Sequence, residues 1–274
     1  MIKYTEYNLH THSFYCGHGS GNLREYVKAA EGLSLGLLGF SEHCPLPDGR
    51  FSKSRMNASM MSVYEADSRA QDGGPVKVLT GYECDWMPEY RSYYEDLLSS
   101  GRADYLITGT HFVPSPDGYF RSVFNPGLGS DDLVTYGKTV LCAMESGLFS
   151  FVAHPDLYMG SYRRWDDNAK ALANDIIACS KALSLPLEIN GNGMLKPPVD
   201  GHYPYPSDPF WELCREEGVL TVMNTDSHSV SSLSKSLGLL KEYEKKIPQN
   251  KVYPVWGADG LKFEEARNDS DKKC

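Results

Sequence analysis

Short apolar segments alternate with longer amphipathic segments along nearly the whole of this 274-residue chain. The alternation is typical of repeated strand–helix units, in which helices cover a mainly parallel sheet. Several apolar segments contain no regular polar positions, which indicates strands buried on both faces. We therefore predict an α/β fold of about seven units, with strands at residues 7–10, 35–41, 76–83, 105–110, 149–154, 186–190 and 220–225.

The segments between these strands carry helix signals. Asn22 can cap a helix in which the apolar residues Leu23, Tyr26, Val27 and Ala30 recur at the spacing of one helix face. Similar patterns predict helices at residues 57–69, 90–99, 131–146, 167–183, 208–217 and 232–245. No linker, repeat or low-complexity tract divides the chain, so we expect residues 1–265 to form a single domain and the charged segment 266–274 to form a frayed tail.

Composition excludes several classes of protein. The formal net charge of −9 argues against a nucleic-acid backbone as the main ligand, because such binding depends on clustered Lys and Arg. The seven cysteines are odd in number and form no C-x-x-C pair, so we expect reduced thiols. No apolar run reaches the roughly 20 residues of a membrane span, and no signal-peptide pattern is present. We expect a soluble, cytoplasmic protein.

Metal-binding residue types follow nearly every predicted strand. His10 and His12 end the first strand, and side chains at this spacing point to the same side. Asp226 and His228 repeat the spacing after the last strand. In a parallel barrel the carboxyl ends of all strands open onto one face, where active sites form. We predict that nine residues converge there: His10, His12, His18, His43, Glu83, His111, His154, Asp226 and His228.

This set of donors indicates the kind of metal. Imidazole and carboxylate together suit zinc, iron or manganese, and we do not expect Cys16 to bind. Nine ligands exceed the needs of one tetrahedral ion, so we expect two or three divalent ions. A single histidine at a strand end is more often structural, but seven of the eight histidines fall at such places. The eighth, His202, lies in a loop and suits a substrate-side or a purely structural role equally well.

In their order along the chain, the motifs resemble the polymerase and histidinol phosphatase (PHP) family. They are "HTH" with the following His18, "SEH", "GYE", "GTH", "AHPD" and "TDSH", spread over residues 8–228. "LEIN" at 187–190 and "HYPYP" at 202–206 are most similar to the monofunctional histidinol-phosphatase branch. The resemblance implies a distorted (β/α)7 TIM-like barrel that carries a trinuclear metal centre. Its ions would be held by His10, His12, Glu83 and Asp226; by Glu83, His111 and His154; and by His18, His43 and His228.

The resemblance also implies an activity. A metal-dependent phosphomonoesterase would hydrolyse L-histidinol phosphate to L-histidinol and phosphate, and we expect a metal-bridging hydroxide to attack phosphorus directly. The alternative within the family is a phosphoesterase acting on nucleotides, oligonucleotides or another small phosphomonoester. A non-catalytic metal-binding domain is a third possibility, which the complete ligand set argues against. A barrel that hydrolyses C–N bonds is less favoured, because the bridging lysine often used there has no evident counterpart.

Phosphate binding requires cations near the metals. Arg163 and Arg164 follow His154 in "GSYRRWDD", and we predict that at least one of them contacts the phosphate. In the related phosphatases a second arginine follows the strand equivalent to "LEIN", whereas Lys196 is the nearest cation here and Arg121 is a weaker substitute.

Other polar residues near the ligands are given narrower roles. Asp226 or His228 can supply the proton that a leaving alkoxide needs. Glu42 is expected to point to the opposite side of its strand from His43 and to support the site or the structure. For Asp85 we expect packing and a hydrogen bond that supports a ligand.

Overall fold

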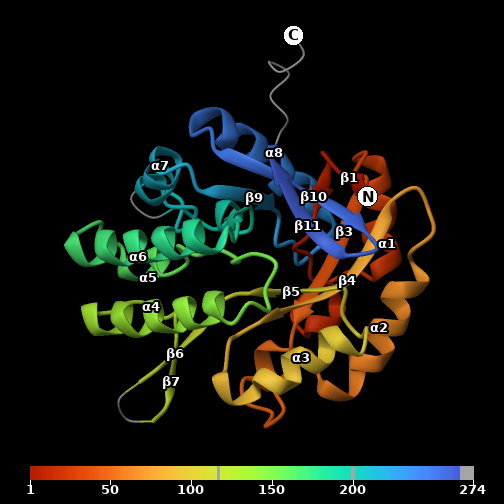
Figure 1. Cartoon of the computed structure of the whole chain (residues 1–274), viewed down its shortest axis with the longest axis horizontal. Helices are drawn as coiled ribbons and strands as arrows, with labels where there is room; N and C mark the ends of the chain where they lie inside the picture. Colours follow the sequence, from red (N-terminus) through yellow and green to blue (C-terminus); the bar gives the residue numbers. More distant parts are fainter. Residues whose placement is uncertain (116–117, 199–200, 266–274) are drawn as a thin grey trace.

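The computed structural model describes residues 1–115, 118–198 and 201–265. Parallel strands form its centre (Figure 1). Two sets pair in the orders β2-β3-β4-β5 and β8-β9. The bounds are β2 (Tyr7–Asn8), β3 (Leu37–His43), β4 (Lys77–Cys84), β5 (Tyr105–Thr108), β8 (Leu187–Asn190) and β9 (Leu220–Asn224).

Isolated bridges join the two sets into a barrel. Val152 pairs in parallel with Thr108 on one side and with Leu187 on the other, and Thr11 pairs with Ser227 to close the ring. The predicted α/β barrel of seven units is therefore confirmed. The fifth strand, predicted at residues 149–154, is reduced to this single bridging position, because the chain turns away at His154, whose φ is +31°, and continues into a proline.

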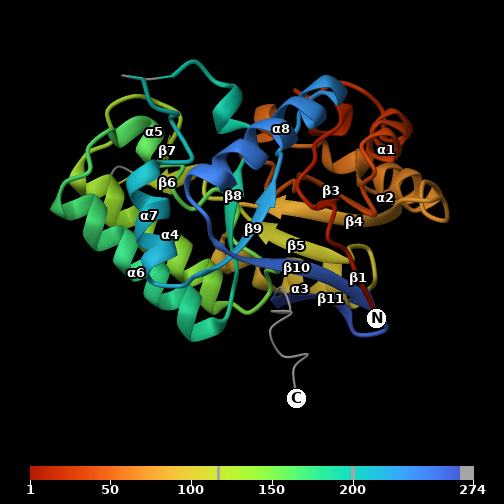
Figure 2. The same ribbon diagram turned by 90° about the horizontal axis from the view of Figure 1, so that it is seen from above.

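Helices surround the barrel, with α4, α6 and α7 on one side and α1 and α2 on the other (Figures 1 and 2). Asn22 caps α1 as predicted, since its side chain accepts from the Glu25 amide and the Glu25 carboxylate accepts from the Asn22 amide. The predicted helices all form, within a few residues of their expected ends. The bounds are α1 (Leu23–Gly32), α2 (Met61–Ala70), α3 (Arg91–Ser99), α4 (Ser130–Glu145), α5 (Met159–Tyr162), α6 (Asp167–Leu183), α7 (Asp208–Glu216) and α8 (Val230–Lys246).

Several elements were not predicted. A hairpin of β6 (Phe112–Pro114) and β7 (Phe120–Ser122) follows the fourth barrel strand. At the C-terminal end, β10 (Asn250–Gly257) runs parallel to β9 and pairs antiparallel with β1 (Ile2–Lys3) and β11 (Gly260–Glu265). Pro254 within β10 hides the strand pattern, since proline is unusual in a strand. The predicted tail at residues 266–274 lies outside the described residues.

The barrel interior is apolar below the site. Its buried cluster includes Leu9, Leu37, Leu79, Tyr105, Ile107, Phe151 and Val222. The Tyr105 hydroxyl donates to the Leu9 carbonyl at 2.7 Å, so this large ring is anchored inside the barrel. Of the helices in the described part of the chain, none has the length and the apolar character needed to cross a bilayer.

Candidate metal centre

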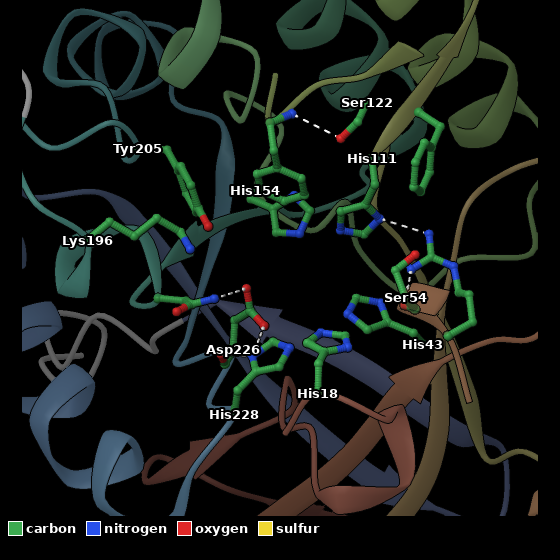
Figure 3. Close-up of a pocket in the computed structure, with 14 residues that line it drawn as sticks. His18, His43, Ser54, His111, Ser122, His154, Lys196, Tyr205, Asp226 and His228 are labelled. Atoms are coloured by element: carbon green, nitrogen blue, oxygen red, sulfur yellow. Dashed lines mark hydrogen bonds and ion pairs between the residues drawn. The ribbon is translucent and has the colours of Figure 1, made fainter. Parts of the chain in front are cut away.

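The nine predicted ligand residues meet at the carboxyl ends of the barrel strands. Each follows or ends a strand whose direction points toward the same opening, as the parallel pairing requires. Seven of the nine are buried, namely His10, His12, His43, Glu83, His111, His154 and Asp226. His18 and His228 lie nearer the surface, and Figure 3 shows both at the rim of the pocket beside His43.

The first ligand group consists of His10, His12, Glu83 and Asp226. The Nε2 atoms of His10 and His12 are 3.0 Å apart, and each lies 3.4 Å from Glu83 Oε2. The same two nitrogens lie 3.5 and 3.3 Å from Asp226 Oδ1. Ligands about 2.0–2.2 Å from a tetrahedral ion are separated by about 3.3–3.6 Å. The four donor atoms therefore surround a space of the size that one such ion requires.

Glu83 links this group to a second one. Its Oε1 atom lies 2.9 Å from His154 Nε2 and 3.3 Å from His111 Nε2, while its Oε2 atom faces the first group. Glu83 Oε2 also lies 2.9 Å from His43 Nδ1, although no hydrogen bond joins them. One carboxylate thus has an oxygen on each side of the cluster, as a bridging ligand would.

The third group consists of the histidine rings of His18, His43 and His228. The centroid of the His18 ring lies 5.1 Å from that of His43 and 4.9 Å from that of His228. Nδ1 of His18 faces the Cys16 carbonyl at 3.2 Å, and Nδ1 of His228 faces the Asp226 carbonyl at 3.0 Å. Because these Nδ1 atoms donate to carbonyls, both Nε2 atoms are left with a free lone pair.

The chemistry of the donor atoms fits divalent cations. Glu83 Oε2 and Asp226 Oδ1 are buried without a hydrogen-bond partner among the described residues, as are the Nδ1 atoms of His12, His43 and His154. Unpaired buried polar atoms are costly, and a cation beside the Glu83 and Asp226 oxygens would satisfy both of them. The backbone is strained here too, since His154 and Asp226 are non-glycine residues with φ values of +31° and +48°.

Electrostatics keep the carboxylates charged. Burial opposes ionisation, but His111, His10 and His43 outweigh it and hold the pKa of Glu83 well below its usual range. His10 and His12 outweigh burial in the same way for the pKa of Asp226. Conversely, burial lowers the pKa of His10 but Glu188, Asp226 and Glu83 raise it well above normal. The carboxylates thus favour a positive charge at the place where the first ion would lie.

The outer histidines are neutral. Burial, with the neighbouring His12, lowers the pKa of His228 to about 3 and that of His43 well below its usual value. The same causes lower the pKa of His18. Neutral imidazole is the form that binds a metal.

Glu188 supports two of the three groups and was missed from the sequence. It is fully buried, and its carboxylate accepts from His10 Nδ1 at 2.9 Å and from the His154 amide at 3.0 Å. A carboxylate on Nδ1 directs the opposite nitrogen of His10 toward the metal. The only signal was its place in "LEIN", two residues before the end of a buried strand.

Glu42 and Asp85 occupy the supporting positions predicted for them. Glu42 accepts from the amide and hydroxyl of Ser13, and its other oxygen lies 3.9 Å from His12 Nδ1. Asp85 accepts from the His111 amide at 2.7 Å and lies 3.1 Å from His111 Nδ1.

A cavity of about 440 Å³ opens above the predicted metal ligands (Figure 3). Lys196 lines it, together with residues that sequence analysis did not single out: Ser54, Arg55, Phe112, Ser122, Phe124, Asn192 and Tyr205. The Lys196 ammonium lies 6.0 Å from the Phe124 ring centroid, and among the described residues no carboxylate is within ion-pairing distance of it. A half-buried cation without an acidic partner therefore faces the cavity.

The other predicted phosphate-binding cations lie elsewhere. Arg163 lines a separate cavity with Trp165 and His202, and its Nε donates to the Gly160 carbonyl. Arg164 is exposed, 3.7 Å from Asp166, and Arg121 pairs with Asp132 at 2.6 Å. None of these three arginines lines the cavity above the predicted metal ligands. A role in phosphate binding for Arg163 or Arg164 therefore has no support from their positions and stays a prediction.

Cys16 lies close to His18 and His228, so distance alone would allow it as a ligand. Its Sγ instead donates to the Ser13 carbonyl and accepts from the Gly19 amide. Burial, with Glu42 nearby, raises the pKa of this thiol to about 12. A protonated thiol is a poor ligand, which agrees with the expectation that Cys16 does not bind metal.

Comparison with known proteins shows which family this chain belongs to. The PHP domain model matches residues 8–192. This chain belongs to the PHP family. A protein named probable histidinol-phosphatase from Deinococcus radiodurans is 30% identical over 227 residues, which cover 80% of this chain and 85% of that protein. A probable phosphatase from Clostridium acetobutylicum is 25% identical over 92% of this chain and 95% of its own length.

Two solved structures share the fold. One is a candidate histidinol phosphatase from Listeria monocytogenes, with a TM-score of 0.73, 20% identity, and coverage of 85% of this chain and 99% of that one. The other is histidinol phosphate phosphatase from Lactococcus lactis, solved with zinc, L-histidinol and phosphate. It has a TM-score of 0.66 and 16% identity, and it covers 93% of this chain and 98% of its own. At these identities the likeness shows the PHP-type barrel fold.

Proposed function

We propose that this PHP protein is a metal-dependent phosphomonoesterase that hydrolyses L-histidinol phosphate to L-histidinol and phosphate. The observation that carries the proposal is the convergence of nine side chains of metal-ligand type below a cavity lined by Lys196, which pairs with no carboxylate among the described residues. The names of the Deinococcus and Lactococcus proteins support the substrate. The cavity is of a size that takes a small phosphorylated molecule.

We propose three divalent ions, of zinc, iron or manganese. His10, His12, Glu83 and Asp226 would hold the first, Glu83, His111 and His154 the second, and His18, His43 and His228 the third. The distances within the first two groups and the stacked rings of the third support this division. Bound ions of this kind lower the pKa of water and clamp phosphoryl oxygens.

The chain's own residues would bind and orient the substrate. Lys196 is placed to take a phosphoryl oxygen, because its charge faces the cavity and no carboxylate in the described part of the chain neutralises it. At the other side of the ligands, His228 has its Nδ1 tied to a backbone carbonyl and lies 3.4 Å from Asp226 Oδ1. The pKa of Asp226 is held well below its usual range and that of His228 is lowered to about 3, so neither side chain is protonated in this arrangement. The proton-donor role expected of them therefore stays a prediction that these pKa values do not favour.

A phosphate-release screen tests the proposal. The purified protein would be assayed with added manganese, zinc or iron on histidinol phosphate, nucleoside monophosphates and a phosphodiester. We expect the highest kcat/KM for histidinol phosphate. A preference for the diester or for nucleotides would reject the substrate and favour the alternative within the family, and a protein that retains no metal would reject the mechanism.

The role of Lys196 can be tested separately with Lys196→Met. A hydrogen bond to a charged group is worth about 1.5–3 kcal/mol, so we expect KM to rise about tenfold to hundredfold with metal content unchanged. Lys235→Met, which removes an exposed lysine of α8, is the matched control and should leave KM unchanged. An unchanged KM in Lys196→Met would show that the phosphate is held by other groups.

A further inference from the structure

Arg55 is unusual among the basic residues of this chain. It is the only Arg or Lys that is buried among the described residues, with 4% of its surface exposed. Arginine is almost never fully buried unless it is paired, because desolvating its charge is costly. The burial of Arg55 therefore points to a specific use of its charge inside the molecule.

The contacts of Arg55 lead to the metal ligands. Its guanidinium forms an ion pair with Asp85, and its Nη2 atom lies 3.4 Å from His111 Nδ1. The third contact is a hydrogen bond from Nη1 to the Ser54 carbonyl at 3.1 Å. In Figure 3 a dashed line marks this contact at the labelled His111 ring. Arg55, Asp85 and His111 thus form a continuous buried chain.

Asp85 holds His111 at two points. One carboxylate oxygen accepts from the backbone amide of His111 at 2.7 Å, and the other lies 3.1 Å from its Nδ1. With the proton on Nδ1, the Nε2 lone pair points toward Glu83 Oε1, 3.3 Å away. Asp85 therefore fixes both the position of the ring and the nitrogen that is free to bind a metal.

Arg55 offsets the negative charge that buried carboxylates concentrate near the predicted ion sites. Six carboxyl groups are buried in the described part of the chain, namely Glu42, Glu83, Asp85, Asp156, Glu188 and Asp226. Asp85 stands two residues from Glu83, so two neighbouring carboxylates would repel each other without a counter-charge. The guanidinium supplies that charge directly beside the Asp85 carboxylate.

We propose that Arg55 is a positioning residue for the metal centre, which acts through Asp85 to orient His111 toward the second ion. The inference rests on the proposed metal-dependent function. Direct phosphate binding is the competing role, because Arg55 lines the cavity. Its side chain is only 2% exposed and two of its nitrogens are already engaged, which favours the positioning role.

Arg55→Met removes the charge and keeps most of the length. Loss of a group that orients a ligand typically costs about tenfold to hundredfold in metal affinity. We expect the variant to retain one ion fewer per chain after dialysis, or to release one ion at least about tenfold faster to a coloured chelator. In the assay kcat should fall, KM should change by less than about twofold, and excess metal should restore much of kcat.

Two further variants guard against misfolding of Arg55→Met. Arg55→Lys keeps a positive charge beside Asp85 and should retain more metal than Arg55→Met. Asp85→Asn should show the same loss of one ion, and adding it to Arg55→Met should have little further effect, because both act on His111. The matched control is Arg50→Met, which removes a nearby arginine that pairs with Asp48 and Glu89, and it should behave as the unmodified protein.

The outcomes separate the two roles of Arg55. Normal metal retention together with a raised KM that excess metal does not correct would overturn the positioning role in favour of phosphate contact. Metal retention and release are measured without substrate, so failure of histidinol phosphate hydrolysis would reject the proposed substrate and leave this inference standing. Unchanged metal retention and unchanged kinetics in Arg55→Met and Asp85→Asn would reject it outright.

Discussion

Glu188 shows how a single side chain can order the metal centre. Besides His10 Nδ1 and the His154 amide, its carboxylate accepts from the side-chain amides of Asn190 at 2.9 Å and Asn224 at 3.0 Å. Four donors thus use the roughly four lone-pair directions of a carboxylate. The side-chain amides of these two asparagines cannot flip without losing hydrogen bonds, because their oxygens accept from the backbone amides of Asn192 and Leu9.

Glu188→Gln should therefore be far more disruptive than its small size change suggests. The glutamine would offer two lone pairs and bring two N–H groups toward existing donors, and each buried unsatisfied group costs about 1–3 kcal/mol. We expect a loss of about 2–5 kcal/mol in the free energy of unfolding, measured by urea denaturation, together with weaker metal binding. Glu65→Gln, at a half-buried ion pair with Arg102, is the control and should cost about 1 kcal/mol or less. Equal costs in the two variants would contradict this account.

At the scale of single residues, the sequence predicts the candidate metal ligands better than the side chains that hold those ligands in place. The ligand positions could be proposed because histidine and acidic residues recur after apolar strands, as His43, His111 and His154 do. Arg55 and Glu188 carry no such signal, since one lies in a loop and the other looks like an ordinary strand residue. Arg55 is 30 positions from its partner Asp85, and Glu188 is 178 positions from its partner His10. Only the fold brings these pairs together.

The segment after β5 depends on a glycine that leaves room for the ligands. A Cβ atom at Gly109 would lie 2.2 Å from Glu83 Oε1 and 2.9 Å from the Cε1 atoms of both His111 and His154. These three residues form the proposed second ion site. The glycine in "GTH" is therefore required by close approach of the ligands to the backbone.

Gly109→Ala should displace the ligands of the second ion. We expect a folded protein that retains fewer ions and has at least about tenfold lower kcat, measured by elemental analysis and phosphate release. Gly238→Ala is a matched control in α8, where the added methyl meets no atom within 4 Å. It should leave metal content unchanged and raise stability by about 0.5–1 kcal/mol, because alanine favours a helix over glycine. A normal metal content in Gly109→Ala would refute the steric argument.

Among the elements, the sequence predicts those that depend on local patterns. The helices and six of the seven barrel strands follow from periodicity and capping, as Asn22 illustrates. The β6–β7 hairpin and β10 depend on pairing with partners rather than on their own composition. The strand predicted at residues 149–154 is an intermediate case. Its apolar residues do lie in the barrel wall, but the turn at His154 ends the strand early and leaves only the bridge at Val152.

At the scale of the whole molecule, the metal centre connects segments from both ends of the chain. His10 and His12 come from the first barrel strand and Asp226 follows the last, yet their donor atoms lie within 3.5 Å of one another. A metal bound there favours the folded state, since the unfolded chain cannot hold these groups together.

Removing metal should therefore lower thermal stability. An ion at 100 times its Kd stabilises a fold by about 2.7 kcal/mol, which corresponds to roughly 5–10 °C in Tm for a chain of this size. We expect a shift of that order between chelator-treated protein and the same protein with zinc or manganese restored, measured by circular dichroism. Glu83→Gln, which alters the bridging carboxylate, should show a much smaller shift. A shift of equal size in that variant would place the stabilising metal elsewhere.

The arrangement of parallel strands around one site could be predicted, because ligand-type residues follow the carboxyl ends of successive strands along the chain. Closure of the barrel was implied by the family resemblance and not by local patterns, since it depends on single bridging positions such as Thr11 with Ser227. The placement of the cavity cations was also beyond the sequence. Lys196 faces the cavity while Arg163 lines a different one, and loop conformation alone separates them.

The pairing of β1 with β10 also bears on how the protein is made. Lys3 lies opposite Val255, so β1 must wait until β10 has been synthesised before it finds its partner. The same delay separates His10 from Asp226 and His228. During synthesis the nascent chain exposes "HTH" without the carboxylates that complete a site, and such long-range contacts form late in folding. An ion that needs donors from both segments would therefore bind only after the two segments have come together in the fold.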